Sequence, residues 1–267
     1  MNAIPSPDLS SVREQVTEEE WNLRVDLAAR YRLVASYGWD DLLFTHLSLR
    51  VPGPEHHFLL NPFGLMFEEV TASSLVKIDV EGNKVMDTPY EVNQAGFTIH
   101  SAVHMAREDA HCVMHLHTDD GVAVSAQEDG VLPITQHAMS IGEIAYLDYE
   151  GVALDLDERE RIVADLGDGQ FMMLRNHGTL TVGATCADAF LAMYYLERAC
   201  SMQVRALAGG TAITRPPQGS PEKAAAQSRR LFDGTAGGFA WPAPVSYTHL
   251  TLPTTCTPCR SRWSPYH

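Results

Sequence analysis

The chain has 267 residues, of which 45% are hydrophobic and 20% charged, so it can bury a globular core and is not expected to be disordered. Its formal net charge of -15 repels phosphate backbones and anionic lipid headgroups, which excludes nucleic acid and membrane surfaces as expected partners. The N-terminus lacks a signal-peptide pattern, and no stretch approaches the ~20 apolar residues of a membrane span. The five cysteines form no disulfide framework, so we expect a cytoplasmic protein.

The two ends of the chain are set apart from its middle. Residues 1–17 are expected to form a flexible N-terminal segment, and residues 18–244 a single domain. Residues 245–267 contain no acidic residue, are rich in Ser, Thr and Pro, and show neither helical nor strand periodicity. The string SYTHLTLPTT resembles a translated sequencing adapter, so we interpret 245–267 as a non-native tail and give no weight to its single C-x-x-C pair.

The first elements of the domain follow from apolar spacing and turn residues. A helix is predicted over 18–37, because Leu23, Leu27, Tyr31 and Val34 fall on one helical face. Thr17 provides an N-cap, and three glutamates follow it in the first turn. Strands are then expected at 42–51 and 56–61, joined by a Pro-Gly-Pro turn, and at 74–85, which contains a hairpin turn.

The second half alternates helices and strands. The helix predicted over 94–107 carries His100 and His104 one turn apart, and a strand follows directly at 110–118. Further along, we expect a helix at 119–127, a short strand at 131–135, a loop at 140–151, a helix at 157–167, a strand at 170–177, a long helix at 186–208 and a smaller helix at 221–231. Continuous alternation without a linker or a repeat predicts one layered α/β domain.

Three histidines form a candidate metal site. In the strand CVMHLHT, His115 and His117 are two residues apart and therefore point to the same side. His177 ends a second predicted strand, where ligands of α/β sheets commonly bind. Three imidazoles would leave a fourth position of a zinc ion open for water or substrate. Among 12 histidines an H-x-H pair can also arise by chance, so the spacing alone leaves a structural role open.

Several longer motifs carry a family resemblance. HSAVHMAREDAHCVMHLHT, RNHGTLTVG and NPFGLMFEEVTASSLVKIDVEGN together resemble the class II aldolase/adducin family, over about residues 18–235. The resemblance implies a three-layer α/β/α domain with a central mixed, largely antiparallel sheet. It also implies a homo-oligomer, with a tetramer favoured, whose active site lies at a subunit boundary. The family's metal histidines correspond to His115, His117 and His177, with zinc the first choice and Fe(II) or manganese as alternatives.

The departures from the family pattern bear on the substrate. In its fuculose-phosphate aldolases, a glutamate that precedes the H-x-H pair by 19 residues acts as the acid/base and as a metal ligand, and here that position is Gly96. The segments that hold the phosphate also differ, so a sugar phosphate is not the expected substrate. The positions that this correspondence still assigns to substrate binding are Thr45, Ser48, Asn61, Gly64 and Gln94.

Other residues must then supply acid/base chemistry. His100 lies one helical turn after Gly96, and His46 occupies the former phosphate loop, so either is a candidate general acid/base near neutral pH. Both also have structural interpretations, His100 as a packed helix residue and His46 as a turn-stabilising one. Tyr146 resembles a family tyrosine that donates a proton beside a neighbouring subunit, although Tyr149 competes for that position.

Three functions remain open. The first is a metal-dependent lyase that acts on a small carbonyl compound or hydroxy acid through an enediolate, by aldol-type cleavage, dehydration or decarboxylation. The second is a non-haem iron oxygenase on the same scaffold, which a three-histidine site without the glutamate would suit. The third is a non-catalytic assembly module, because the sequence is closest in texture to the adducin head domain.

Overall fold

The computed structural model describes residues 10–151, 156–244 and 246, so the interpretations of residues 1–9 and of almost all of 245–267 concern segments outside this description. The helices are α1 (Ser10–Gln15), α2 (Glu18–Ser36), α3 (Gln94–Ala106), α4 (Asp119–Ser125), α5 (Gln136–Ile141), α6 (Glu158–Leu166), α7 (Cys186–Ala208), α8 (Ser220–Phe232) and α9 (Thr235–Ala240), with a 3-10 turn at Phe67–Glu69. The strands are β1 (His46–Arg50), β2 (Phe58–Leu60), β3 (Val76–Ile78), β4 (Cys112–Leu116), β5 (Ala145–Leu147), β6 (Phe171–Leu174) and β7 (Gly178–Gly183).

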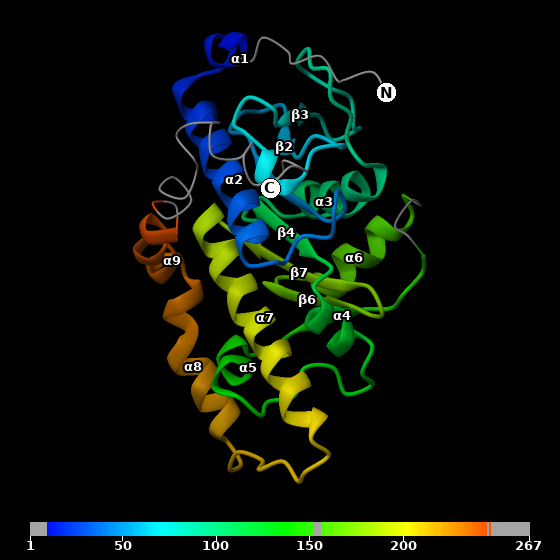
Figure 1. Ribbon diagram of the computed structural model, residues 1–267, viewed down its shortest axis with the longest axis vertical. Coiled ribbons are helices and arrows are strands. Elements are labelled where there is room, and N and C mark those ends of the chain that lie inside the picture. The colour runs from blue at the N-terminus through cyan, green and yellow to red at the C-terminus, as the bar shows by residue number, and fades with distance from the viewer. Residues whose placement is uncertain (1–9, 152–155, 245, 247–267) are drawn as a thin grey trace, which may run out of the picture.

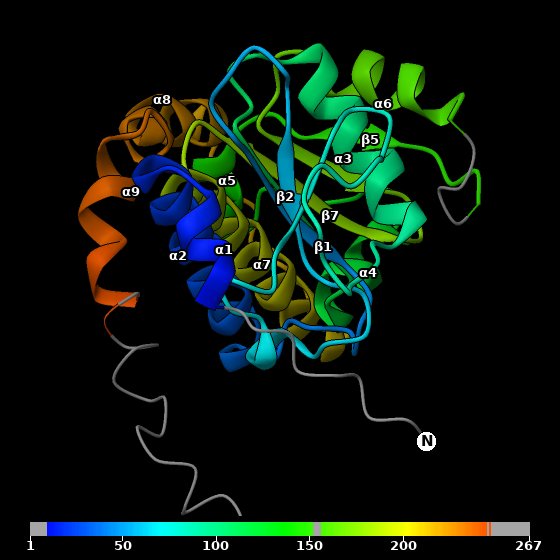
Figure 2. The same ribbon diagram turned by 90° about the horizontal axis from the view of Figure 1, so that it is seen from above.

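The strands form one sheet in the order β3-β2-β1-β4-β7-β6-β5. Every neighbouring pair is antiparallel except β5 and β6, which are parallel. The sheet lies between two helical layers, with α2, α7, α8 and α9 on one side and α3 and α6 on the other (Figures 1 and 2). The expected α/β/α fold with a mixed, largely antiparallel sheet is therefore confirmed.

The alternation of side chains along β4 divides the core between the two layers. Cys112, Met114 and Leu116 pack with residues of α2 and α7 in one apolar cluster. Val113 points the other way, into a cluster with residues of α3 and α6. Because side chains alternate along a strand, His115 shares the face of Val113. The sheet thus presents its strand-borne histidine to the α3 and α6 side.

Some local predictions were wrong. Residues 131–135 form no strand, in keeping with Pro133, which has no N–H to donate to a sheet. β5 lies within the segment expected to be a loop, and α5 and α9 had no clear apolar period to reveal them. Residues 178–183 form strand β7, although the sequence pattern predicts only a connection into the long helix there.

The described N-terminal residues are largely helical. Ser10–Gln15 forms α1, inside the segment that was expected to be flexible. α2 begins after Thr17, whose side chain accepts a hydrogen bond from the Glu20 N–H, as the cap pattern predicts. Within the described ranges, no helix is long and apolar enough to cross a membrane.

Candidate metal centre

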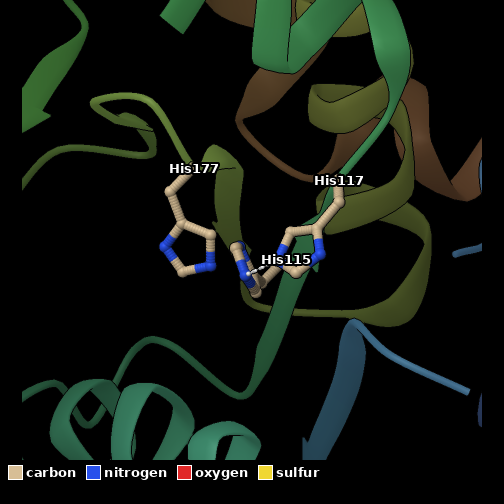
Figure 3. Close-up of side chains that lie close together, drawn as sticks. All are labelled: His115, His117 and His177. Carbon is tan, nitrogen blue, oxygen red and sulfur yellow. Dashed lines mark hydrogen bonds between the residues drawn. The ribbon is translucent and has the colours of Figure 1, made fainter. Parts of the chain in front are cut away.

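Two neighbouring strands position the three histidines. His115 lies in β4 and His117 follows it, while His177 lies in the tight connection between β6 and β7 rather than in a strand. Asn176, with a φ of 57°, supplies the left-handed residue that a three-residue hairpin connection needs. Because β4 pairs with β7, this connection lies beside the end of β4. The three rings face one another (Figure 3), with centroids 4.7–4.8 Å apart.

The hydrogen bonds of the rings fix which nitrogens carry protons. His115 Nδ1 lies 3.0 Å from the Thr179 carbonyl oxygen, and His117 Nδ1 lies 3.1 Å from an Asp41 carboxylate oxygen. Both partners can only accept, so in neutral rings both Nδ1 atoms are the donors and both Nε2 atoms carry lone pairs. These two Nε2 atoms are only 2.9 Å apart, a repulsive arrangement unless a cation lies between them.

The surroundings of His115 and His177 also disfavour protonation of their rings, so a proton is not the favoured cation between the nitrogens. Burial, followed by the neighbouring His177 and His117, holds the pKa of His115 well below its ordinary value. Burial and His117 lower the pKa of His177 to about 4. Neutral imidazoles are the form that binds metals, and one ligand nitrogen from each of the three residues lies within 4.8 Å of the others. The donor set of His115, His117 and His177 therefore fits a divalent cation.

A cavity of about 360 Å³ opens beside the three histidines. Its walls combine apolar side chains, namely Phe44, Ile99 and Tyr149, with the polar residues Thr45 and His46. No lysine or arginine lines it in the part of the chain that the structure describes. Thr45 is fully buried with a φ of 68°, and its hydroxyl has no hydrogen-bond partner among the described atoms. The described wall of the cavity therefore offers polar atoms without hydrogen-bond partners, and none of its side chains is a lysine or an arginine.

His46 fills the space beside Gly96. A Cβ atom on Gly96 would lie 2.5 Å from Cγ and Cδ2 of the His46 ring, which is closer than non-bonded atoms allow. Both ring nitrogens of His46 are buried without a hydrogen-bond partner in the described chain. Burial, with His117 and His177, lowers the pKa of His46 to about 3, so the ring is neutral. Of the two candidate acid/base histidines, His46 is the one that lines the cavity.

His100 is buried behind this wall. Ser48 Oγ lies 2.6 Å from His100 Nδ1 and 2.7 Å from His104 Nε2, while His104 Nδ1 lies 3.1 Å from the Ala110 carbonyl oxygen. Burial, reinforced by His46 and His104, lowers the pKa of His100 well below its ordinary value. Neither His100 nor Ser48 lines the cavity, so the structure joins two predicted site residues to each other rather than to a substrate.

The remaining predicted residues lie elsewhere. Asn61 is buried, and its side-chain oxygen accepts a hydrogen bond of 3.1 Å from the Tyr31 hydroxyl. Gly64 is an exposed turn residue with a φ of 107°, and the side chain of Gln94 is outside the described structure. The Tyr146 hydroxyl accepts a hydrogen bond from the Val131 N–H, and its ring packs in the cluster on the α7 side of the sheet. Within one chain, Asn61, Gly64 and Tyr146 do not line the cavity beside the three histidines.

Sequence reasoning missed Asp41 and left Tyr149 as an alternative. Asp41 holds His117 from a position 76 residues away, so no local spacing could have indicated the contact. The Tyr149 ring centroid lies 6.4 Å from that of His177, and Tyr149 rather than Tyr146 lines the cavity.

Known proteins resemble this chain over most of its length. The sequence profile of the Class II Aldolase and Adducin N-terminal domain matches residues 25–204. The chain belongs to the class II aldolase/adducin family. A Caulobacter vibrioides protein named after aldolase class 2 is 59% identical over 87% of this chain and 91% of its own length. Alpha-adducin of Rattus norvegicus is 45% identical over 84% of this chain, which corresponds to 31% of the adducin.

Solved structures of family members have the same fold. An aldolase II superfamily protein from Pseudomonas syringae is 49% identical, with a TM-score of 0.86 over 90% of this chain and 97% of that one. L-fuculose 1-phosphate aldolase from Glaciozyma antarctica is 33% identical, with a TM-score of 0.76 over 87% of this chain and 90% of that one. Class II aldolases are typically dependent on divalent metals, in keeping with the three-histidine cluster.

Proposed function

We propose that this protein is a metal-dependent lyase that acts on a small, non-phosphorylated carbonyl compound or hydroxy acid. The observation that carries the proposal is the pair of Nε2 lone pairs of His115 and His117, 2.9 Å apart beside His177, at the wall of a cavity. A divalent cation there, zinc by preference, would polarise a substrate carbonyl and offset the charge of an enediolate during C–C cleavage, dehydration or decarboxylation.

The residues around the cavity have separate tasks in this proposal. Asp41 and the Thr179 carbonyl keep both histidines in the tautomer that presents Nε2 to the ligand site. His46, whose ring nitrogens have no partner among the described residues, is the group that exchanges a proton with the substrate. The Thr45 hydroxyl is placed to hydrogen-bond a substrate oxygen, while Phe44 and Tyr149 shield the reacting atoms from water.

The absence of a lysine or arginine from the described cavity wall supports a substrate without phosphate. Proteins hold a phosphate dianion with charged donors, above all arginine and lysine. A phosphate here would meet Phe44, Ile99 and Tyr149, and the Asp41 carboxylate would repel it. The name of the 33% identical fuculose 1-phosphate aldolase points the other way, toward a phosphate ester. The test therefore includes both kinds of ligand.

Metal content and proton exchange test the proposal together. Elemental analysis of protein purified without a chelating column should show about one divalent metal per chain, and His115→Ala should remove it. His111→Ala is the matched control, because His111 is exposed and directly precedes the first residue of the same strand. In deuterated water, wild-type protein should exchange one hydrogen of hydroxyacetone or dihydroxyacetone stereospecifically, as followed by proton NMR. Faster exchange on dihydroxyacetone phosphate would refute the non-phosphorylated substrate.

Two alternatives have their own readouts. Imidazole nitrogens, which the three histidines supply, also suit iron, so oxygen uptake by the iron-loaded protein would favour an oxygenase. The 45% identity to alpha-adducin supports a non-catalytic assembly module. Absence of bound metal, together with unchanged self-association in His115→Ala, would favour that module over the lyase.

We also propose that the active protein is a homo-oligomer, with a tetramer favoured. Two apolar side chains of the cavity wall are exposed in the single chain, to 45% for Phe44 and 53% for Tyr149, and so is Leu42, two residues before Phe44, to 62%. Light scattering coupled to gel filtration measures the assembly directly. A monomer at micromolar concentration would contradict this part of the proposal.

A further inference from the structure

A buried carboxylate lies on the far side of the sheet from the metal histidines, where the proposed reaction does not use it. Glu197, in the middle of α7, is only 2% exposed. Within the described chain it forms no ion pair, and its oxygens accept hydrogen bonds from two threonine hydroxyls: Thr118 Oγ1 at 2.5 Å and Thr179 Oγ1 at 2.7 Å. Desolvating a carboxylate for two neutral donors is costly, so an apolar residue would make a more stable core.

The two threonines are joined to the metal ligands. Thr118 directly follows His117, and its hydroxyl also accepts a hydrogen bond of 3.0 Å from the Gly121 N–H at the start of α4. Thr179 lies two residues after His177, and its carbonyl oxygen is the acceptor for His115 Nδ1 at 3.0 Å. Each threonine therefore faces Glu197 with its side chain and contacts the ligand set through its backbone.

The geometry points to Glu197 as a positioning residue for the metal centre. One carboxylate bridges the end of β4 and the start of β7 from behind, and so fixes the spacing of the two segments that carry His115, His117 and His177. The inference rests on the proposed metal centre and deepens it. It assigns Glu197 no contact with the metal or the substrate, because its bonds all lie on the α7 side of the sheet.

Other charged groups near Glu197 do not replace this bridge. Asp119 and Asp120 of α4 and Arg198 and Arg205 of α7 line the same cavity of about 460 Å³ as Glu197. Asp120 accepts a hydrogen bond from the Ser201 hydroxyl and forms an ion pair with Arg205. Burial raises the pKa of Glu197 to about 7, its two threonine hydrogen bonds lower it, and Asp120 raises it further. The Cys200 thiol, one turn along α7, also interacts with Glu197, and burial raises its pKa well above the ordinary value.

The β7 strand offers a matched pair of substitutions. Thr179 and Thr181 are both fully buried on the same face, but the Thr181 hydroxyl donates to the Ala189 carbonyl at 3.0 Å instead of to Glu197. Thr179→Val and Thr181→Val therefore remove equivalent hydroxyls, and only the first breaks the bridge. Glu197→Leu removes both bonds, whereas Glu197→Gln retains a group that can bond both hydroxyls.

The experiment measures zinc affinity by competition with a chromophoric chelator, together with the visible spectrum of the cobalt-loaded protein. Thr179→Val and Glu197→Leu should weaken zinc binding about tenfold, the lower end of the range for residues that orient metal ligands. They should also alter the cobalt spectrum, while Thr181→Val and Glu197→Gln remain close to wild type. If Thr179→Val and Thr181→Val are equivalent, or if melting temperatures fall with no change in zinc affinity, Glu197 is ordinary packing and the inference is wrong.

A metal-free readout separates this inference from the proposed function. In protein treated with chelator, NMR detects the His115 Nδ1–H proton that the Thr179 carbonyl accepts. Glu197→Leu and Thr179→Val should shift this signal or lose it to exchange, and Thr181→Val should not. A wild-type protein that binds no zinc but shows this pattern would refute the metal centre while supporting the positioning. Unchanged signals in all variants would refute the positioning itself.

Discussion

The contact between His46 and Gly96 makes Gly96→Ala a sensitive perturbation. Gly96 lies near the start of α3, where alanine is favoured over glycine by about 1 kcal/mol on helix propensity alone. In the native chain, however, the new Cβ would lie 2.5 Å from two carbons of the His46 ring. Overpacking of this kind typically costs about 1–3 kcal/mol, so the substitution should destabilise the wild-type protein.

The sign of the effect should reverse when the ring is removed. In a His46→Ala background the space beside Gly96 is free, and Gly96→Ala should then stabilise the protein by up to about 1 kcal/mol. The helix-propensity gain is common to both backgrounds and cancels, so the coupling energy of the double-mutant cycle is expected to equal the overpacking cost, about 1–3 kcal/mol. Residues that share no contact have much smaller coupling energies.

Urea denaturation followed by circular dichroism measures all four proteins, with a chelator present so that metal binding does not contribute. Gly238→Ala is the control, since a Cβ on this glycine of α9 would meet nothing within 4 Å and should have the same effect in both backgrounds. If Gly96→Ala changed stability with the same sign and size whether or not His46 was present, the packing of His46 against α3 would be refuted.

Three further outcomes follow from the site. Burial raises the pKa of Glu197 from 4.5 to about 7, so ionising this side chain destabilises the folded protein as the pH rises. In metal-free denaturation, the free energy of unfolding of Glu197→Gln should therefore increase by about 3 kcal/mol relative to that of the wild type between pH 4 and pH 8. A difference that stays constant with pH would contradict this. Asp41→Ala should weaken zinc binding roughly 10–100-fold in chelator competition, because it releases His117 Nδ1, whereas equal weakening by Asp40→Ala would rule this out. Zinc at about 100 times its dissociation constant should stabilise the wild type by about 2.7 kcal/mol, and a similar gain in His177→Ala would exclude His177 as a ligand.

Local patterns in the sequence were enough for much of the fold. The α2 cap at Thr17 and the limits of α7 depend on neighbouring residues, and both agree with the structure. The H-x-H pair on one side of β4 follows from the two-residue period of a strand. Where the pattern was short or interrupted by proline, as around 131–135, the local signal was too weak to separate a strand from a loop.

The sequence by itself was enough to pick out His115, His117 and His177 as candidate metal ligands, because each histidine can be recognised from its own strand or motif. Only the tertiary structure decided which contacts the other residues of the site make. Packing across the sheet placed His46 in the space left by Gly96, tied Ser48 to His100 and His104, and brought Asp41 to His117. Such contacts join segments far apart in the chain, and their register is set by how whole layers pack, which no local period encodes.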